Sequence, residues 1–174
     1  MSNHRKDNSV TNKVTTVLFI IYLIALFWIL LFKLGVRFSD TGSRSLNLIP
    51  FNNGKIDVSE TILNVIIFVP PGIYAGALFK SWTFSTKLFF LFLISLVFEV
   101  LQFILRIGIL DITDIITNTS GGIIGLMIFK AIEKVFNNSV KAKKIINIVA
   151  AIGTVLMISL LLLLKMNMLP VRYQ

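Results

Sequence analysis

Three stretches of the chain, each 19 or 20 residues long, contain no charged side chain: residues 14–32, 61–79 and 145–164. An α-helix rises about 1.5 Å per residue, and the hydrocarbon core of a bilayer is about 30 Å thick. Each stretch is therefore long enough to cross a membrane as a helix. Because lipid offers no partner for backbone polar groups, these stretches predict membrane-spanning helices.

The composition supports a membrane protein with more than three spans. The 174 residues are 56% hydrophobic and only 14% charged, which is too apolar for a soluble domain of this length. Two further segments are equally apolar but contain polar groups. We predict an all-α bundle in one membrane domain, 14–164, between tails 1–13 and 165–174, with spans at 14–33, 61–79, 86–107, 112–132 and 145–164.

The net charge of +9 comes from Lys and Arg in the short segments that flank the spans. This distribution is typical of membrane topology and argues against nucleic-acid binding. If the N-terminus is cytoplasmic, ten of these residues lie inside and seven outside. We therefore expect a multi-pass protein of the cell membrane, with the N-terminus in the cytoplasm and the C-terminus outside.

The sequence contains few of the residues that metal sites and hydrolytic active sites require. The chain has no Cys, and its single His, His4, lies in the N-terminal tail. This excludes disulfides and thiolate metal sites and argues against zinc chemistry. Asp111 and Asp114 could share a divalent cation, but two carboxylates are a thin ligand set. No cofactor is predicted.

Two segments depart from a simple helical pattern. Pro70 and Pro71 remove two amide donors near the middle of the second span, which predicts a kinked or broken helix. Between the first two spans, residues 44–54 mix apolar and polar side chains around Pro50, which prevents a continuous helix. This loop either rests at the membrane interface or dips into the bundle, and both alternatives remain open.

Polar side chains recur on one face of the third and fourth spans. The spacing i, i+3, i+7 is shared by Glu99, Gln102 and Arg106 and by Asp111, Asp114 and Asn118. Because few residues join the two spans, they are antiparallel neighbours whose polar faces can meet. Gly121 and Gly125, near this face, form a GxxxG pattern that permits close helix contact.

Strict alternation of the spans brings more polar residues to the same membrane face. The predicted ligand-binding residues are Arg44, Asn47, Asn64, Glu99, Gln102, Arg106, Asp111, Asp114 and Asn118. Polar groups are costly in hydrocarbon, so this set indicates a ligand site or a buried structural network.

Two of these residues need partners at different depths. We expect Arg106 to pair with Asp111 or Asp114 near the membrane surface. Glu99 should lie about 10 Å deeper, from the rise of the helix. Its candidate partners are Asn64, Asn118, Arg44 or its own proton.

Four motifs within residues 44–125 occur together in a known family: RSLNLIPF at 44–51, NVIIFVPPG at 64–72, FEVLQ at 98–102 and DITDIITNTSGGIIG at 111–125. On these motifs the chain resembles the VanZ-like membrane proteins. The resemblance implies a bacterial cell-membrane protein tied to resistance to teicoplanin-like lipoglycopeptides, and it implies no mechanism. The resemblance implies that the predicted ligand-binding residues, except Arg106, are the polar positions characteristic of the family.

Three functions fit these observations. The first is a non-catalytic factor that binds a lipid headgroup, a lipid-linked cell-wall precursor or the antibiotic, with Arg44 and Arg106 pairing an anionic head. The second is an intramembrane enzyme that modifies such a lipid, with Glu99 as general base and Asp111 and Asp114 as metal ligands or acid partners. The third is an accessory subunit of a larger assembly. The sequence predicts no oligomeric state.

Overall fold

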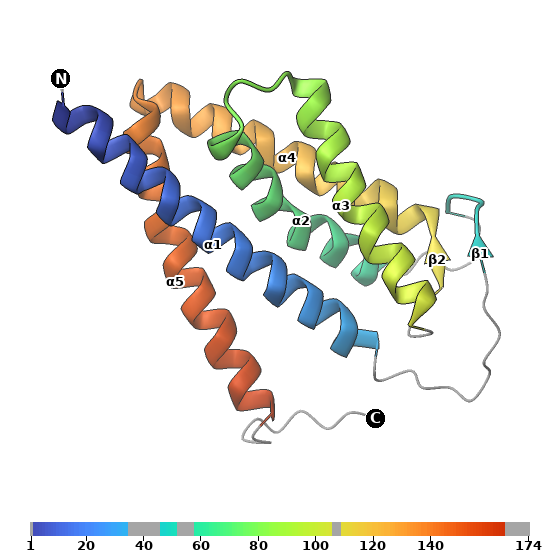
Figure 1. Ribbon diagram of the computed structural model, residues 1–174. Coiled ribbons are helices and arrows are strands. Elements are labelled where there is room, and N and C mark those ends of the chain that lie inside the picture. The colour runs from blue at the N-terminus through green and yellow to red at the C-terminus, as the bar shows by residue number, and fades with distance from the viewer. Residues whose placement is uncertain (1, 35–45, 52–57, 106–108, 166–174) are drawn as a thin grey trace.

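The computed structural model describes residues 2–34, 46–51, 58–105 and 109–165 (Figure 1). In this part of the chain there are five helices and two short strands. They are α1 (Ser2–Leu34), β1 (Leu46–Asn47), α2 (Val58–Leu78), α3 (Phe84–Ile104), β2 (Leu110–Asp111), α4 (Ile112–Phe136) and α5 (Ser139–Lys165). The predicted all-α fold is confirmed. Residues 2–13 of the predicted tail form the first turns of α1.

Four helices are long and apolar enough to cross a membrane. Within the described residues these are Asn8–Trp28 of α1, and α2, α3 and α4 over their full lengths. The helix α5 has 27 residues and contains the uncharged run 145–164, and its crossing of the membrane stays a prediction. The chain is thus a multi-pass membrane protein.

The second helix is not broken at its two prolines. It runs continuously from Val58 to Leu78 with Pro70 and Pro71 inside. In a regular helix the carbonyl of Ile67 would accept the amide hydrogen of residue 71, which proline lacks. The hydroxyl of Tyr22 in α1 donates to this carbonyl over 2.7 Å. A neighbouring helix therefore replaces one of the backbone hydrogen bonds that the prolines remove.

The helices α2 and α4 approach each other at backbone contact distance. A Cβ atom on Gly121 would overlap the carbonyl oxygen of Val65, and one on Gly125 would overlap that of Val69. The close helix contact predicted for this GxxxG pattern is confirmed, and its partner is α2. The glycines are required here because any side chain would push the two helices apart.

Aromatic side chains pack α1 and α3 around α2. Phe68 of α2 is fully buried and meets the Phe98 ring edge to face, with 6.3 Å between centroids. Leu26 of α1 completes this cluster. Beyond it, Ile146 of α5 packs with Phe129 of α4. The bundle is therefore closed by side chains from all five helices.

A two-stranded parallel sheet ties the first loop to the start of α4. Its register pairs Leu46 with Leu110 and Asn47 with Asp111. The sequence pattern did not predict these strands, because two residues are too few to show an alternation. The described part of the 44–54 loop, residues 46–51, lies at the end of the bundle where α3 ends and α4 begins (Figure 1). It does not run between the helices.

Candidate functional site

Asp111 connects the first loop to the fourth helix. It is the N-cap of α4, and its Oδ1 accepts a hydrogen bond from the amide of Thr113 over 2.7 Å. Its Oδ2 accepts a hydrogen bond from Nδ2 of Asn47 over 2.9 Å. A carboxylate at this position accepts a hydrogen bond from a helix amide that has no partner within the helix. Its negative charge is also stabilised by the positive end of the helix dipole. The same carboxylate thereby fixes the loop.

Glu99 lies beside the backbone of this cap. Its side chain is only 2% exposed, and Oε2 accepts a hydrogen bond from the amide of Asp111 over 3.2 Å. The 10 Å depth predicted for Glu99 was counted along α3 from Arg106, which lies outside the described residues, so that depth stays a prediction. The chain turns back after α3 so that α4 begins level with Glu99, several residues before α3 ends. The backbone amide was not among the predicted partners, because residue spacing on one helix does not reveal its register against the next.

Asn64 joins α2 to the same group. The side chain is 4% exposed, and Nδ2 donates to Oδ1 of Asp114 over 2.7 Å. The acceptor is a carboxylate, so this hydrogen bond is stronger than one between neutral groups. The second, third and fourth helices therefore meet at one level of the bundle.

One turn deeper, Asn118 of α4 faces α3. Its Nδ2 donates to the Ser95 hydroxyl over 3.1 Å. Its Oδ1 is buried and has no hydrogen-bond partner among the described residues. An unsatisfied buried acceptor costs roughly 1–3 kcal/mol, so this oxygen is a position where a donor would be stabilising. Gln102 is also buried, at 7% exposure.

The structure brings most of the predicted residues together at one end of the bundle, which we call the polar cluster. It consists of Asn47, Asn64, Ser95, Glu99, Asp111, Thr113, Asp114 and Asn118. Arg44 and Arg106 lie outside the described residues, so their predicted pairings are not described. Ser95 and Thr113 were missed, because single hydroxyl residues are common in membrane helices and carry no signal without a neighbour. Ser95 does lie four residues before Glu99, on the same face.

The two aspartates are occupied by hydrogen-bond donors. Asp111 accepts from Asn47 and Thr113, and Asp114 accepts from Asn64. Over the described ranges no three His, Asp or Glu side chains come close enough to hold a metal ion. The metal-ligand role of Asp111 and Asp114 stays a prediction.

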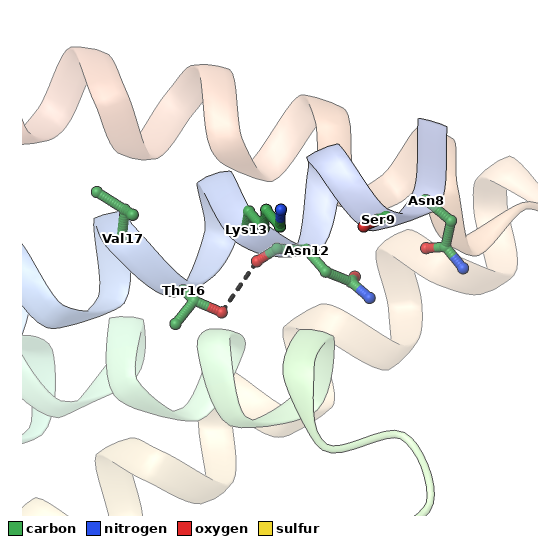
Figure 2. A pocket seen from close by; sticks show the side chains of 6 residues that line it. All are labelled: Asn8, Ser9, Asn12, Lys13, Thr16 and Val17. Carbon is green, nitrogen blue, oxygen red and sulfur yellow. Dashed lines mark hydrogen bonds between the residues drawn. The ribbon is translucent and has the colours of Figure 1, made fainter. Parts of the chain in front are cut away.

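A shallow, open hollow lies on the surface of α1 at the opposite end of the bundle. It is lined by Asn8, Ser9, Asn12, Lys13, Thr16 and Val17, most of which are exposed (Figure 2). The polar cluster and this hollow are separated by most of the length of α1 (Figure 1). No sequence motif had indicated this second place.

Comparison with known proteins identifies the family. The family model described as VanZ/LLP1 matches residues 19–137. The chain is 40% identical over 144 residues to Protein VanZ of Enterococcus faecium, covering 81% of this chain and 86% of that protein. No solved structure matches the chain. The matched range contains all four motifs and the whole polar cluster, and the chain belongs to the VanZ/LLP1 family.

Proposed function

We propose that this protein lowers the sensitivity of a bacterial cell to lipoglycopeptide antibiotics of the teicoplanin class. In this proposal the polar cluster binds the polar head of an amphiphile in the outer half of the membrane. The amphiphile is a membrane lipid, a lipid-linked cell-wall precursor or the antibiotic itself, and its apolar tail stays among the surrounding lipids.

One observation carries the proposal: polar side chains from four separate segments are joined by hydrogen bonds at one end of the bundle. The first loop supplies Asn47, α2 supplies Asn64, and α3 and α4 supply the others. Membrane proteins rarely keep so many ionisable groups at one level unless they serve a ligand or an ion. Oδ1 of Asn118, which has no partner in the described part of the chain, adds an acceptor for a donor on the ligand.

The predicted division of labour follows from side-chain chemistry. Arg44 and Arg106 pair with an anionic head, because guanidinium groups bind phosphate and carboxylate in two-point geometry. Asn47, Asn64 and Gln102 orient the head by hydrogen bonds. The carboxylates of the cluster hold the arginines in place or meet a cationic group on the ligand.

Substitutions within the cluster test this proposal. Arg44→Ala, Asn47→Ala, Asp114→Asn and Asn118→Ala should each abolish resistance to teicoplanin, while the amount of protein in the membrane stays near normal. Asn147→Ala is a matched control. Asn147 is 8% exposed and hydrogen-bonded to Thr11 and Thr15, so its loss disturbs a buried polar group away from the cluster.

The readouts are the inhibitory concentration of teicoplanin and the quantity of protein in isolated membranes. If all four cluster variants disappear from the membrane, the cluster is a structural network, because breaking such a network is itself destabilising. If Asn147→Ala abolishes resistance as fully as the cluster variants, the cluster has no special role.

A further inference from the structure

The two ends of the bundle differ in charge. Residues 2–13, the α2–α3 turn at 80–87 and the segment 130–144 lie at the end opposite the polar cluster (Figure 1). These segments contain ten Lys or Arg residues and only two acidic residues, Asp7 and Glu133. The rest of the chain contains seven basic and six acidic residues. Nearly all of the net charge of +9 therefore belongs to this end, whichever basic residue Asp7 approaches.

Exposed lysines are concentrated where α4 ends and α5 begins. Lys130 and Lys134 lie in the C-terminal turns of α4, and Lys141 and Lys144 lie in the first turns of α5. All four side chains are exposed. The acidic residue of this segment, Glu133, is 2.5 Å from Nζ of Lys80 and forms an ion pair with it. The segment thus presents positive charge on its surface.

The start of α5 is also positive because of its backbone. A helix N-terminus has a partial positive charge, which acidic residues usually offset. The first turn of α5 contains no acidic residue. Its amides are satisfied by a neutral side chain, since Oδ1 of Asn138 accepts hydrogen bonds from the amides of Val140 and Lys141 over 2.9 and 3.1 Å. Lysines here are electrostatically unfavourable within the protein, so an anionic surface beside them would be stabilising.

Two features indicate that this segment lies at the membrane interface. The 25 residues of α4 form a helix about 37 Å long, which exceeds the roughly 30 Å of a hydrocarbon core. In the α2–α3 turn, Trp82 stacks on Phe79 with 4.2 Å between ring centroids, and Trp is enriched at the headgroup level of membranes. The ion pair of Lys80 with Glu133 joins this turn to α4. The residues after Glu133 are therefore near the headgroup layer.

Two exposed apolar side chains lie among the lysines. Val135 is 77% exposed and Phe136 is 42% exposed. Apolar and basic side chains next to each other are typical of segments in the membrane interface, where the first reach acyl carbons and the second reach phosphates. A soluble anionic partner would satisfy only the lysines. The combination therefore favours lipid over a soluble acidic protein.

We propose that the end of α4 and the start of α5 form a surface that binds anionic phospholipids in the leaflet at this end of the bundle. The phosphates contact the exposed lysines, and the upper acyl carbons contact the apolar pair. The residues of this surface are Lys130, Lys134, Val135, Phe136, Lys141 and Lys144. The surface is separate from the polar cluster, so this proposal does not depend on the function proposed there.

Quenching of tryptophan fluorescence by brominated lipids tests this surface in the full-length protein. The chain has two tryptophans, so Trp28→Phe and Trp82→Phe with Phe136→Trp leave a single tryptophan in place of Phe136. The protein is reconstituted into phosphatidylcholine bilayers that contain brominated phosphatidylglycerol or brominated phosphatidylcholine. Phosphatidylglycerol should bind about fivefold more tightly beside this tryptophan, since one lysine near a membrane surface contributes roughly 1 kcal/mol. Lys134→Gln should lower this ratio severalfold, and adding Lys141→Gln should bring it close to one.

The matched control is Lys87→Gln, which should leave the ratio unchanged. It removes one positive charge from the same end of the bundle, but Lys87 lies in the first turn of α3, away from the α4–α5 turn (Figure 1). If Phe136→Trp lowers the yield of folded protein, Val135→Trp provides a second reporter on the same surface.

Three results would overturn the proposal. Equal binding of the two lipids would mean that the lysines face a soluble acidic partner or act only in topology. An equal loss in Lys134→Gln and Lys87→Gln would indicate attraction by the total charge of this end. The third result is a preference that stays constant from roughly 0.1 M to roughly 1 M salt, because the screening length falls from about 10 Å to about 3 Å over that range.

Discussion

At the scale of single residues, substitution of Glu99 distinguishes a binding role of the polar cluster from a catalytic one. The hydrogen bond from the amide of Asp111 to Glu99 requires only an acceptor oxygen, which Gln also provides. We therefore expect Glu99→Gln to keep substantial resistance. Glu99→Lys should abolish it, because an ammonium group would face a backbone N–H in a buried position. Teicoplanin inhibitory concentrations, normalised to the amount of protein in the membrane, measure both effects.

An enzyme would behave differently at the same position. Removal of a general base lowers catalysis by about 10²-fold or more, so Glu99→Gln would then be as inactive as Glu99→Lys. That result, obtained with both variants folded, would contradict a purely binding role for the polar cluster.

The residues of the cluster could be predicted as a group but not as pairs. Periodicity placed Glu99 on one helix face and Asp114 on another, and alternation of the spans placed both with Asn64 at one end. The hydrogen bond between Asn64 and Asp114 depends on the axial register of α2 against α4. That register is set by Gly121 and Gly125 against the α2 backbone, which no single-helix pattern contains.

At the scale of helices, the contact between α2 and α4 makes a sharp prediction. Gly125→Ala should destabilise the protein by about 1–3 kcal/mol, the usual range for overpacking, although Ala is the better helix former. Its Cβ would overlap the carbonyl oxygen of Val69. Gly153 in α5 is the control, because a Cβ there meets no atom within 4 Å. Unfolding in mixed detergent should show a loss for Gly125→Ala and none for Gly153→Ala. Equal behaviour of the two variants would contradict the tight packing of α2 on α4.

The continuity of α2 depends on α1 in a way that a double-mutant cycle can measure. Tyr22→Phe removes the donor to the Ile67 carbonyl and should cost about 1–3 kcal/mol. In Pro71→Ala the new amide of residue 71 can bond this carbonyl within the helix. Tyr22→Phe should therefore cost less in that background. Strictly additive free energies of unfolding would mean that the hydroxyl does not compensate for the proline.

At the scale of the whole molecule, the five-span prediction is tested by topology reporters. A reporter fused to the C-terminus should be outside the cytoplasm, and one inserted within 130–144 should be inside. The reason is the excess of Lys on the face that contains the N-terminus of α1 and the turn between α4 and α5. A finding that both reporters lie on one side would contradict a membrane crossing by α5.

The helices of this molecule were predictable because membrane spans leave a long signal in sequence. Runs of 19 or 20 uncharged residues need no tertiary information to be recognised. The two-residue pairing of β1 with β2, and the contact between α2 and α4, arise only when distant segments meet. Local propensity at Pro70 and Pro71 predicts a kinked or broken helix, whereas α2 is continuous and α1 supplies a donor to the Ile67 carbonyl.

The pairing of β1 with β2 also determines when the first loop can take up its final structure during synthesis of the chain. At roughly 5–20 residues per second, a ribosome needs several seconds to extend the chain from Leu46 to Leu110. During that interval α2 and α3 are synthesised, and Asn47 has no Asp111 to bind. A nascent chain arrested before α4 therefore carries the first loop without its strand partner. The earliest part of the cluster to leave the ribosome gains its partner only when the fourth helix begins.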